Sequence, residues 1–200
     1  MTKQSVLVRD VVGFGFLYAQ LAATFWLVPD WSPAHIGEPV YLAALANVVT
    51  AAAITAIRLS GRRGSDAERL VLAVFLAGMP LIYLSSWLLA PQPGWLAGEL
   101  VGTALFAALA FIGWRRSIWV LAFGIAAHGL AWDLWHYDHA TFIPNWYALG
   151  CLITDVSLGI YVALQAPFFA SSVGARALGG SASDQAASRL ILPSPSSSAR

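Results

Sequence analysis

The chain has 200 residues, of which 58% are hydrophobic and only 10% are charged, and its formal net charge is +1. Soluble domains carry about 25% charged residues, so this composition excludes a globular domain that covers its own surface in water. The expected partner is the lipid bilayer. No basic patch with interleaved aromatic residues lies outside the membrane-flanking loops, which argues against nucleic-acid binding.

Six apolar runs, each close to the roughly 20 residues that a helix needs to cross a bilayer, follow one another along the chain. They lie near 8–28, 39–59, 69–89, 95–114, 117–137 and 146–167. Backbone groups in hydrocarbon must be hydrogen-bonded within their own segment, so each run is predicted to be a helix. The sequence therefore predicts an all-α fold, a six-helix transmembrane domain over residues 1–169. The first run has no clean small-residue cleavage site, and we expect a retained helix rather than a signal peptide.

The distribution of the basic residues predicts the orientation of these helices. All of them fall at the two ends of the chain or in the second and fourth connections: Lys3, Arg9, Arg58, Arg62, Arg63, Arg69, Arg115, Arg116, Arg176, Arg189 and Arg200. In a six-helix arrangement these positions share one side, which the positive-inside rule places in the cytoplasm. We therefore expect a multi-pass protein of the inner (plasma) membrane with both termini cytoplasmic.

The third and fourth runs contain packing signals. Pro80 removes a backbone donor from the third run and predicts a kink there. Gly94, Gly98 and Gly102 repeat every fourth residue in the fourth run, a spacing that lets another helix approach closely. The stripe predicts close packing within the bundle, or docking of this helix on a second copy or another membrane protein.

Residues 170–200 differ in composition from the rest of the chain. Serine, alanine, glycine and proline predominate, and large apolar residues are few. Such a segment buries too little apolar surface to offset the entropy of ordering. The sequence predicts a disordered cytoplasmic tail.

Ionisable residues concentrate near the outer end of the fifth run, where residues 128–139 hold three of the four histidines. Acidic groups inside apolar helices are costly and are functional candidates, here Glu99, Asp133 and Asp155. At a rise of about 1.5 Å per residue, His128 and Asp155 lie roughly 12 and 13 Å below the outer ends of their helices. Because the fifth and sixth runs are antiparallel and joined by a short loop, these two side chains are predicted to pair.

Other polar and aromatic residues complete the predicted outer half. The polar residues are Gln20, Asn47, Cys151 and, at the rim, His35. The tryptophans at this end are Trp26, Trp31, Trp87, Trp95, Trp132, Trp135 and Trp146. The simplest arrangement is an aromatic-lined funnel that opens to the outside and narrows to His128 and Asp155. Cys151 is expected to be a packing residue, since no basic neighbour stabilises a thiolate.

Acid–base and proton-coupled chemistry are the first two interpretations of this site. His128 and Asp155, with Asp133 and Glu99, would act as catalytic acid–base groups on a lipid or other small molecule. Alternatively, the same groups would carry protons in a transporter. No P-loop, HExxH motif or serine-nucleophile elbow is present. Enzyme and transporter therefore both remain open.

A metal site and a structural role are the other two interpretations. Histidine and carboxylate ligands suit a divalent metal, as in a hydrolase acting at the outer leaflet. His128 and His136 lie two helical turns apart, roughly 12 Å, and cannot share one ion. A metal would need His136 with Asp133 and His139 or His35, or else His128 with Asp155. In a structural or assembly subunit, the pair would instead hold helices together by interhelical hydrogen bonding.

Overall fold

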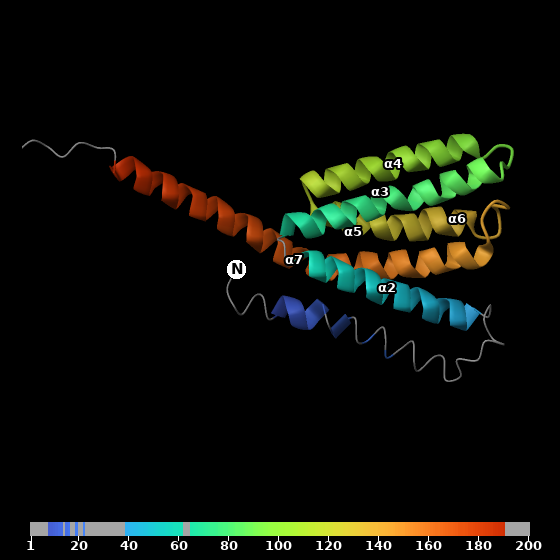
Figure 1. Ribbon diagram of the computed structural model, residues 1–200, viewed down its shortest axis with the longest axis horizontal. Helices are drawn as coiled ribbons and strands as arrows, with labels where there is room; N and C mark the ends of the chain where they lie inside the picture. Colours follow the sequence, from blue (N-terminus) through green and yellow to red (C-terminus); the bar gives the residue numbers. More distant parts are fainter. Residues whose placement is uncertain are drawn as a thin grey trace, which may run out of the picture.

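The computed structural model describes residues 8–13, 15–16, 19, 22, 39–61 and 65–190, with the backbone alone beyond residue 169. This part of the chain is all-helical (Figure 1). Its elements in order are α2 (Pro39–Gly61), α3 (Ser65–Leu89), α4 (Leu96–Arg115), α5 (Ile118–Ala127), the π-helical turn η2 (His128–Asp133), α6 (Leu134–His136) and α7 (Asn145–Leu190). The predicted all-α class is confirmed.

Four described helices are long and apolar enough to cross a membrane. They are Asp66–Leu89, Leu96–Arg115, Ile118–His136 and Asn145–Phe169. A shorter apolar helix, Ala43–Leu59, forms most of α2. Large apolar side chains such as Phe111, Trp119 and Phe123 are more than half exposed on the outside of the bundle, as expected for a surface that lipid covers. The described pieces of the first predicted run are helical, but most of that run lies outside the described residues.

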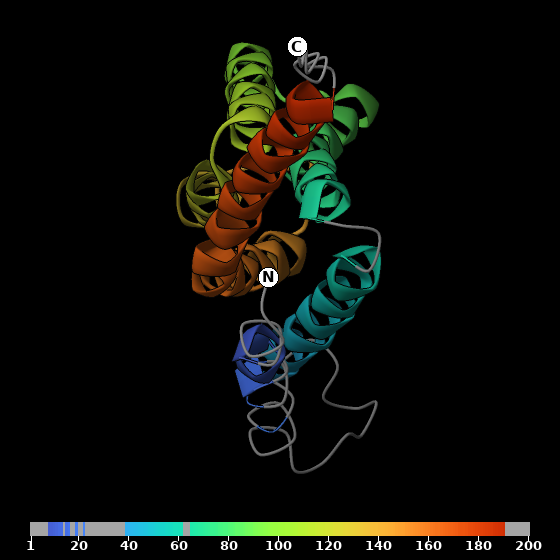
Figure 2. The ribbon, with the colours of Figure 1, turned by 90° about the vertical axis from the view of Figure 1, so that its left-hand side faces the viewer.

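The bundle is held together by close contact of α5 and η2 with α7. α3 packs on α4, and α2 packs on α7, so that α2 and α4 lie on opposite sides of the bundle (Figures 1 and 2). A Cβ atom at Gly159 would lie 2.8 Å from the Cβ of Ala126, and one at Gly129 would lie 3.0 Å from the Cβ of Asp155. Only glycine permits this approach, which places His128, the neighbour of Gly129, beside Asp155.

The predicted glycine stripe has a different role from the one expected. Gly94 precedes α4 in a turn, with a φ of +84°. Gly98 and Gly102 face the indole rings of Trp135 and Trp132, which a Cβ would approach to 2.7 and 2.0 Å. These two glycines thus accommodate tryptophans of the same chain. Docking of α4 on a partner through another face stays a prediction.

Two further details concern α3 and α7. α3 continues through Pro80 without a break. The sequence predicts disorder from residue 170, whereas the backbone of α7 is helical to Leu190 and projects from the bundle (Figure 1). The prediction of disorder rests on how little apolar surface this segment can bury in a core. The alanine, leucine, glutamine and arginine of this segment nevertheless have a high intrinsic preference for helix.

Candidate functional site

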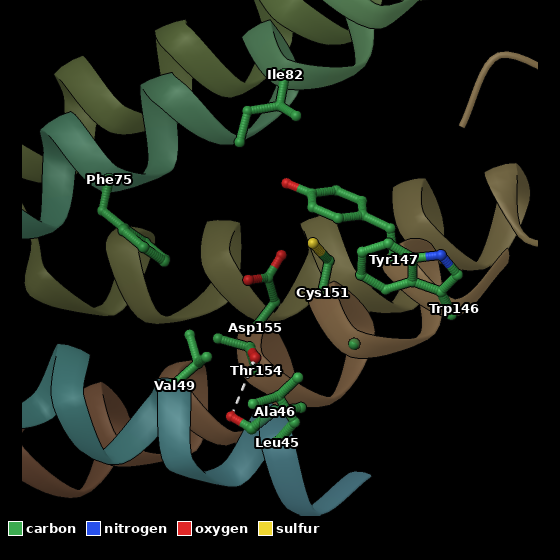
Figure 3. Close-up of a pocket in the computed structure, with 11 residues that line it drawn as sticks. Leu45, Ala46, Val49, Phe75, Ile82, Trp146, Tyr147, Cys151, Thr154 and Asp155 are labelled. Atoms are coloured by element: carbon green, nitrogen blue, oxygen red, sulfur yellow. Dashed lines mark hydrogen bonds between the residues drawn. The ribbon is translucent and has the colours of Figure 1, made fainter. Parts of the chain in front are cut away.

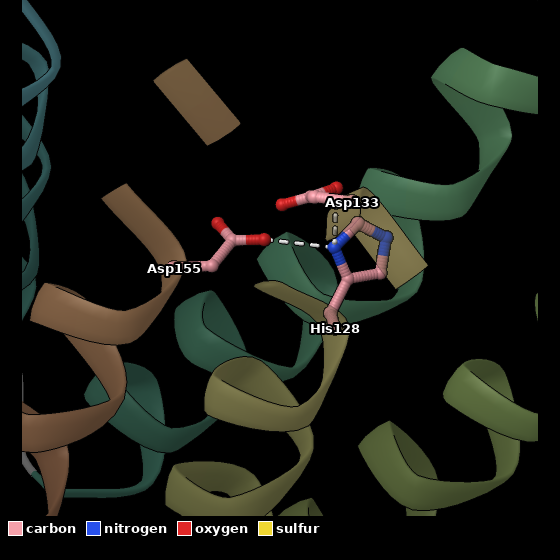
Figure 4. A group of neighbouring side chains, drawn as sticks. All are labelled: His128, Asp133 and Asp155. Atoms are coloured by element: carbon pink, nitrogen blue, oxygen red, sulfur yellow. Dashed lines mark hydrogen bonds and ion pairs between the residues drawn. The ribbon is translucent and has the colours of Figure 1, made fainter. Parts of the chain in front are cut away.

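His128 and Asp155 form a buried pair between η2 and α7. His128 Nδ1 lies 2.7 Å from Asp155 Oδ2, and the two residues are 1% and 3% exposed. Figure 4 shows the Asp155 carboxylate directed at this nitrogen. The pairing predicted from helical depth is therefore confirmed.

The π-helical turn adds a second carboxylate to this pair. Asp133 is fully buried, and its Oδ1 lies 3.4 Å from the same His128 Nδ1. In a π-helix each hydrogen bond spans five residues instead of four, so residues 128 and 133 lie one turn apart on the same face. A regular α-helix would separate them by about 140°. We call His128, Asp133 and Asp155 the His128 cluster.

Tyr83 on α3 belongs to the site but is absent from the sequence-based candidates. Its hydroxyl donates a hydrogen bond of 2.7 Å to Asp133 Oδ1. Its ring lies between the two buried histidines, 4.2 Å from the His136 ring and 6.0 Å from the His128 ring. The sequence feature that points to Tyr83 is its hydroxyl group, which lies in the middle of the apolar run 69–89.

Glu99 and His136 form a second buried pair, separate from the His128 cluster. His136 Nε2 lies 2.7 Å from Glu99 Oε1, and both residues are 0% exposed. His136 Nδ1 lies 2.8 Å from the Trp132 carbonyl oxygen. Since a carbonyl only accepts, Nδ1 carries a hydrogen, and one further proton is shared between Nε2 and Glu99. Of the four predicted acid–base residues, Glu99 is thus the one that pairs outside the His128 cluster.

Aromatic rings enclose the second pair. The centroids of five rings lie within 6 Å of the His136 ring: Tyr83, Trp95, Trp132, Trp135 and Phe142. Three of the tryptophans predicted to line an outer vestibule thus cover a buried imidazole.

The predicted metal ligands His136, Asp133 and His139 do not come together. His136 pairs with Glu99, and Asp133 faces His128. His139 is exposed and its Nδ1 lies 2.9 Å from the Tyr137 carbonyl oxygen. The predicted ligand set relies on the side-chain positions of a regular α-helix, and the π-helical turn η2 interrupts that helix. Within the described ranges, the group of three metal-capable side chains is instead the His128 cluster, whose ligand atoms all lie within 4.8 Å of one another.

A cavity of about 270 Å³ lies beside the His128 cluster, between α2, α3 and α7 (Figure 3). It is lined by Leu45, Ala46, Val49, Phe75, Ile82, Trp146, Tyr147, Gly150, Cys151, Thr154 and Asp155. Most of this wall is apolar. Figure 3 shows the Asp155 carboxylate and the Cys151 thiol facing the space between α3 and α7. Thr154 donates a 3.3 Å hydrogen bond to the Ala46 carbonyl and fixes the α2 side of the cavity.

Among the described residues, the end of the bundle that carries the α3–α4 and α6–α7 connections is tightly packed where the sequence predicts a funnel. Phe142 and Ile143, in the loop between α6 and α7, are buried against Tyr83. Gln92 Oε1, in the α3–α4 connection, accepts hydrogen bonds of 2.7 and 2.9 Å from the Thr141 backbone N–H and hydroxyl. The aromatic residues pack under this loop instead of lining an open vestibule. Asp155 is instead exposed to the cavity between α2, α3 and α7.

The remaining sequence-based candidates lie outside this geometry. Asn47 is half-buried on α2 and does not line the cavity. Gln20 and His35 lie outside the described residues. Asn145 begins α7 and donates from Nδ2 to Asp138 Oδ1.

The charges of the His128 cluster require compensation. Two carboxylates and one imidazole are buried together, and a lone buried charge is costly unless it is paired. A positive charge placed between Nδ1 and the two carboxylates lowers this cost: a proton offsets one negative charge, and a divalent metal ion offsets both. A group that gives up or accepts such a charge beside an apolar cavity is suited to acid–base chemistry.

Residues 42–168 match a family of unknown function (DUF6010). This range extends from α2 to the end of the membrane-length part of α7, and it contains the His128 cluster, Tyr83 and the Glu99–His136 pair. No curated protein matches the chain, and no solved structure matches it.

Proposed function

We propose that this chain, which belongs to the DUF6010 family of unknown function, holds a small and largely apolar molecule in the cavity and acts on it by acid–base chemistry at the His128 cluster. The substrate class is a lipid or a lipid-like molecule with one polar group. One observation carries this proposal: Asp155 both hydrogen-bonds His128 and lines the cavity.

The cavity determines the kind of molecule. Pockets of roughly 300 Å³ or more that are mainly apolar, with a few convergent polar groups, are typical of small-molecule sites. Here the apolar walls come from α2 and α3, and the polar groups gather on α7. An apolar molecule would lie with its polar group at Asp155.

The residues of the site have distinct roles in this proposal. Asp155 is the group that contacts the substrate and exchanges a proton with it. His128 holds the proton that compensates Asp155. Asp133 and Tyr83 extend this network away from the cavity and fix the position of the imidazole. The Glu99–His136 pair contacts neither the cavity nor Asp155, and it acts as a positioning element through Tyr83 and Trp132.

The setting is also a proposal. We infer six membrane-spanning helices in the inner (plasma) membrane, with both termini in the cytoplasm, because four described helices have membrane length and all the basic residues fall on one side of a six-helix arrangement. In a Cys151→Ala background, Pro93→Cys and Arg116→Cys test the orientation. A membrane-impermeant thiol reagent applied to intact cells should label the first and spare the second. The reverse pattern would invert the topology.

A cavity-filling variant tests the function. A Cβ at Gly150, in the cavity wall, meets nothing within 4 Å, and the same holds for Gly78 on α3, which does not line the cavity. Gly150→Leu therefore adds a side chain whose Cβ starts in open space at the cavity wall, and Gly78→Leu is its matched control. Mass spectrometry of organic extracts should find a species that co-purifies with the wild type and Gly78→Leu and is lost from Gly150→Leu. Identical extracts from all three would contradict a ligand in the cavity.

A further inference from the structure

We propose that the His128 cluster is a binding site for a divalent metal ion of the zinc class. The ligands are Nδ1 of His128 and one carboxylate oxygen each from Asp133 and Asp155. This inference rests on the site of the proposed function: the ion takes the place of the proton that His128 shares with Asp155, and the group that exchanges protons with the substrate is then one bound to the ion. The ligand set differs from the one predicted from the sequence, because it arises from the π-helical turn.

The distances between the ligand atoms fit one ion. Zinc binds imidazole nitrogen and carboxylate oxygen at about 2.0–2.2 Å, so ligand atoms around a tetrahedral ion lie roughly 3.3–3.6 Å apart. His128 Nδ1 lies 2.7 Å from Asp155 Oδ2 and 3.4 Å from Asp133 Oδ1. All three residues offer ligand atoms within 4.8 Å of one another. The 3.4 Å distance fits this spacing as it stands, and the 2.7 Å distance would have to lengthen by about 0.6–0.9 Å on metal binding.

A proton alone leaves part of the cluster unsatisfied. Hydrogen on Nδ1 is shared mainly with Asp155, the nearer carboxylate. Asp133 is fully buried, and its Oδ2 has no hydrogen-bond partner among the described residues. Figure 4 shows this oxygen directed toward the Asp155 side of the cluster, not away from it. A dication between the carboxylates neutralises both of them and gives this oxygen a partner.

The surroundings also fit a metal centre. Ligand carboxylates are normally held by a further hydrogen bond, and the Tyr83 hydroxyl donates one to Asp133. Three protein ligands leave one position of a tetrahedral zinc ion free, which is the pattern of catalytic sites. Since Asp155 also lines the cavity, an ion bound here would lie next to the cavity. A water molecule or a carbonyl oxygen of the bound lipid would occupy the free position.

Metal content of the purified full-length chain tests the inference. After exposure to zinc and removal of excess metal, the wild type should retain about one ion per chain. His128→Gln and Asp133→Asn should each lower the content at least tenfold. His136→Gln removes the other buried histidine, and His139→Gln removes an exposed one; both should retain the ion. A metal-free wild type, or retention in His128→Gln and Asp133→Asn, would overturn the proposal, and so would loss in His136→Gln alone.

A measurement on the wild type guards against variants that fail to fold. X-ray absorption at the zinc edge should show only nitrogen and oxygen ligands, including one imidazole. A sulfur ligand would overturn the ligand set, since it would bring in Cys151. The cavity experiment keeps the two proposals separable. A metal-free chain that still retains its lipid species defeats the metal site alone, whereas a metal-loaded chain without such a species defeats only the proposed function.

Discussion

His128 and Asp133 face each other across one π-helical turn, with Nδ1 and Oδ1 3.4 Å apart, and both side chains are buried. π-turns inside α-helices are rare, and those that occur frequently lie at functional sites. Here the turn places a second carboxylate on the nitrogen that Asp155 already contacts. His128 Nδ1 therefore lies close to two carboxylates, that of Asp133 on its own helix and that of Asp155 on α7.

Gly129 controls the distance between η2 and α7. In Gly129→Ala, the new methyl group would lie 3.0 Å from the Asp155 Cβ and from the Leu152 carbonyl oxygen. We expect a loss of about 1–3 kcal/mol, typical of overpacking, seen as a lower thermal unfolding temperature in detergent. Gly78→Ala, where the added atom meets nothing within 4 Å, is the control. Equal unfolding temperatures for the two variants would show that the close approach is not required.

The Tyr83 hydroxyl is expected to contribute through Asp133. Tyr83→Phe keeps the ring between the two histidines and removes the 2.7 Å hydrogen bond to Asp133 Oδ1. Leaving a buried acceptor without its donor costs about 1–3 kcal/mol, which denaturant unfolding should detect. Tyr137→Phe, at an exposed position, should change stability little. If the two variants unfold alike, the hydroxyl does not support the carboxylate.

The Glu99–His136 pair is expected to be uncharged. In that form Glu99 carries the shared proton and donates to Nε2, while Nδ1 donates to the Trp132 carbonyl oxygen. The amide of Glu99→Gln reproduces this donor, so we expect a stability change of less than about 1 kcal/mol, against about 1–3 kcal/mol for Glu99→Ala. Equal destabilisation by both substitutions would indicate an ion pair instead.

The loop between α6 and α7 is expected to depend on Gln92. Gln92→Ala removes both hydrogen bonds that its Oε1 accepts from Thr141. At about 0.5–1.5 kcal/mol each, their loss should speed amide hydrogen exchange around residues 139–143 by roughly tenfold. Ser85→Ala, on the exposed side of α3, serves as the control. Unchanged exchange would mean that the buried Phe142 and Ile143 hold this loop in place without the hydrogen bonds between Gln92 and Thr141.

The helices and one buried pair could be predicted from the sequence. Apolar runs of membrane length require helices, and a constant rise per residue places His128 and Asp155 at the same depth. Both inferences depend only on regular helix geometry. The count to Asp155 follows the regular helix α7, whereas the count to His128 crosses η2, and the two side chains pair all the same.

The rest of the site depends on departures from that geometry. The π-helical turn rotates Asp133 onto His128, and no spacing rule for an α-helix anticipates it. The burial of Phe142 and Ile143 depends on tertiary contacts with Tyr83 from another helix. The two glycines that bring helices together, Gly129 and Gly159, are isolated in the sequence and form no repeat. Two of the repeated glycines, Gly98 and Gly102, instead leave room for the indole rings of Trp135 and Trp132.

The central claim is that Asp155 acts on a molecule held in the cavity and does not merely join two helices. The most direct measurement compares organic extracts of the purified wild type, Asp155→Asn and a distant carboxylate control, Asp66→Asn, by mass spectrometry. Asp155→Asn keeps the shape of the cavity wall and removes the acid–base group, so it should retain an unreacted species that the wild type and the control hold only in converted form. The same species in equal amounts in all three, with only the thermal stability of Asp155→Asn lowered, would contradict the account and leave a structural pair.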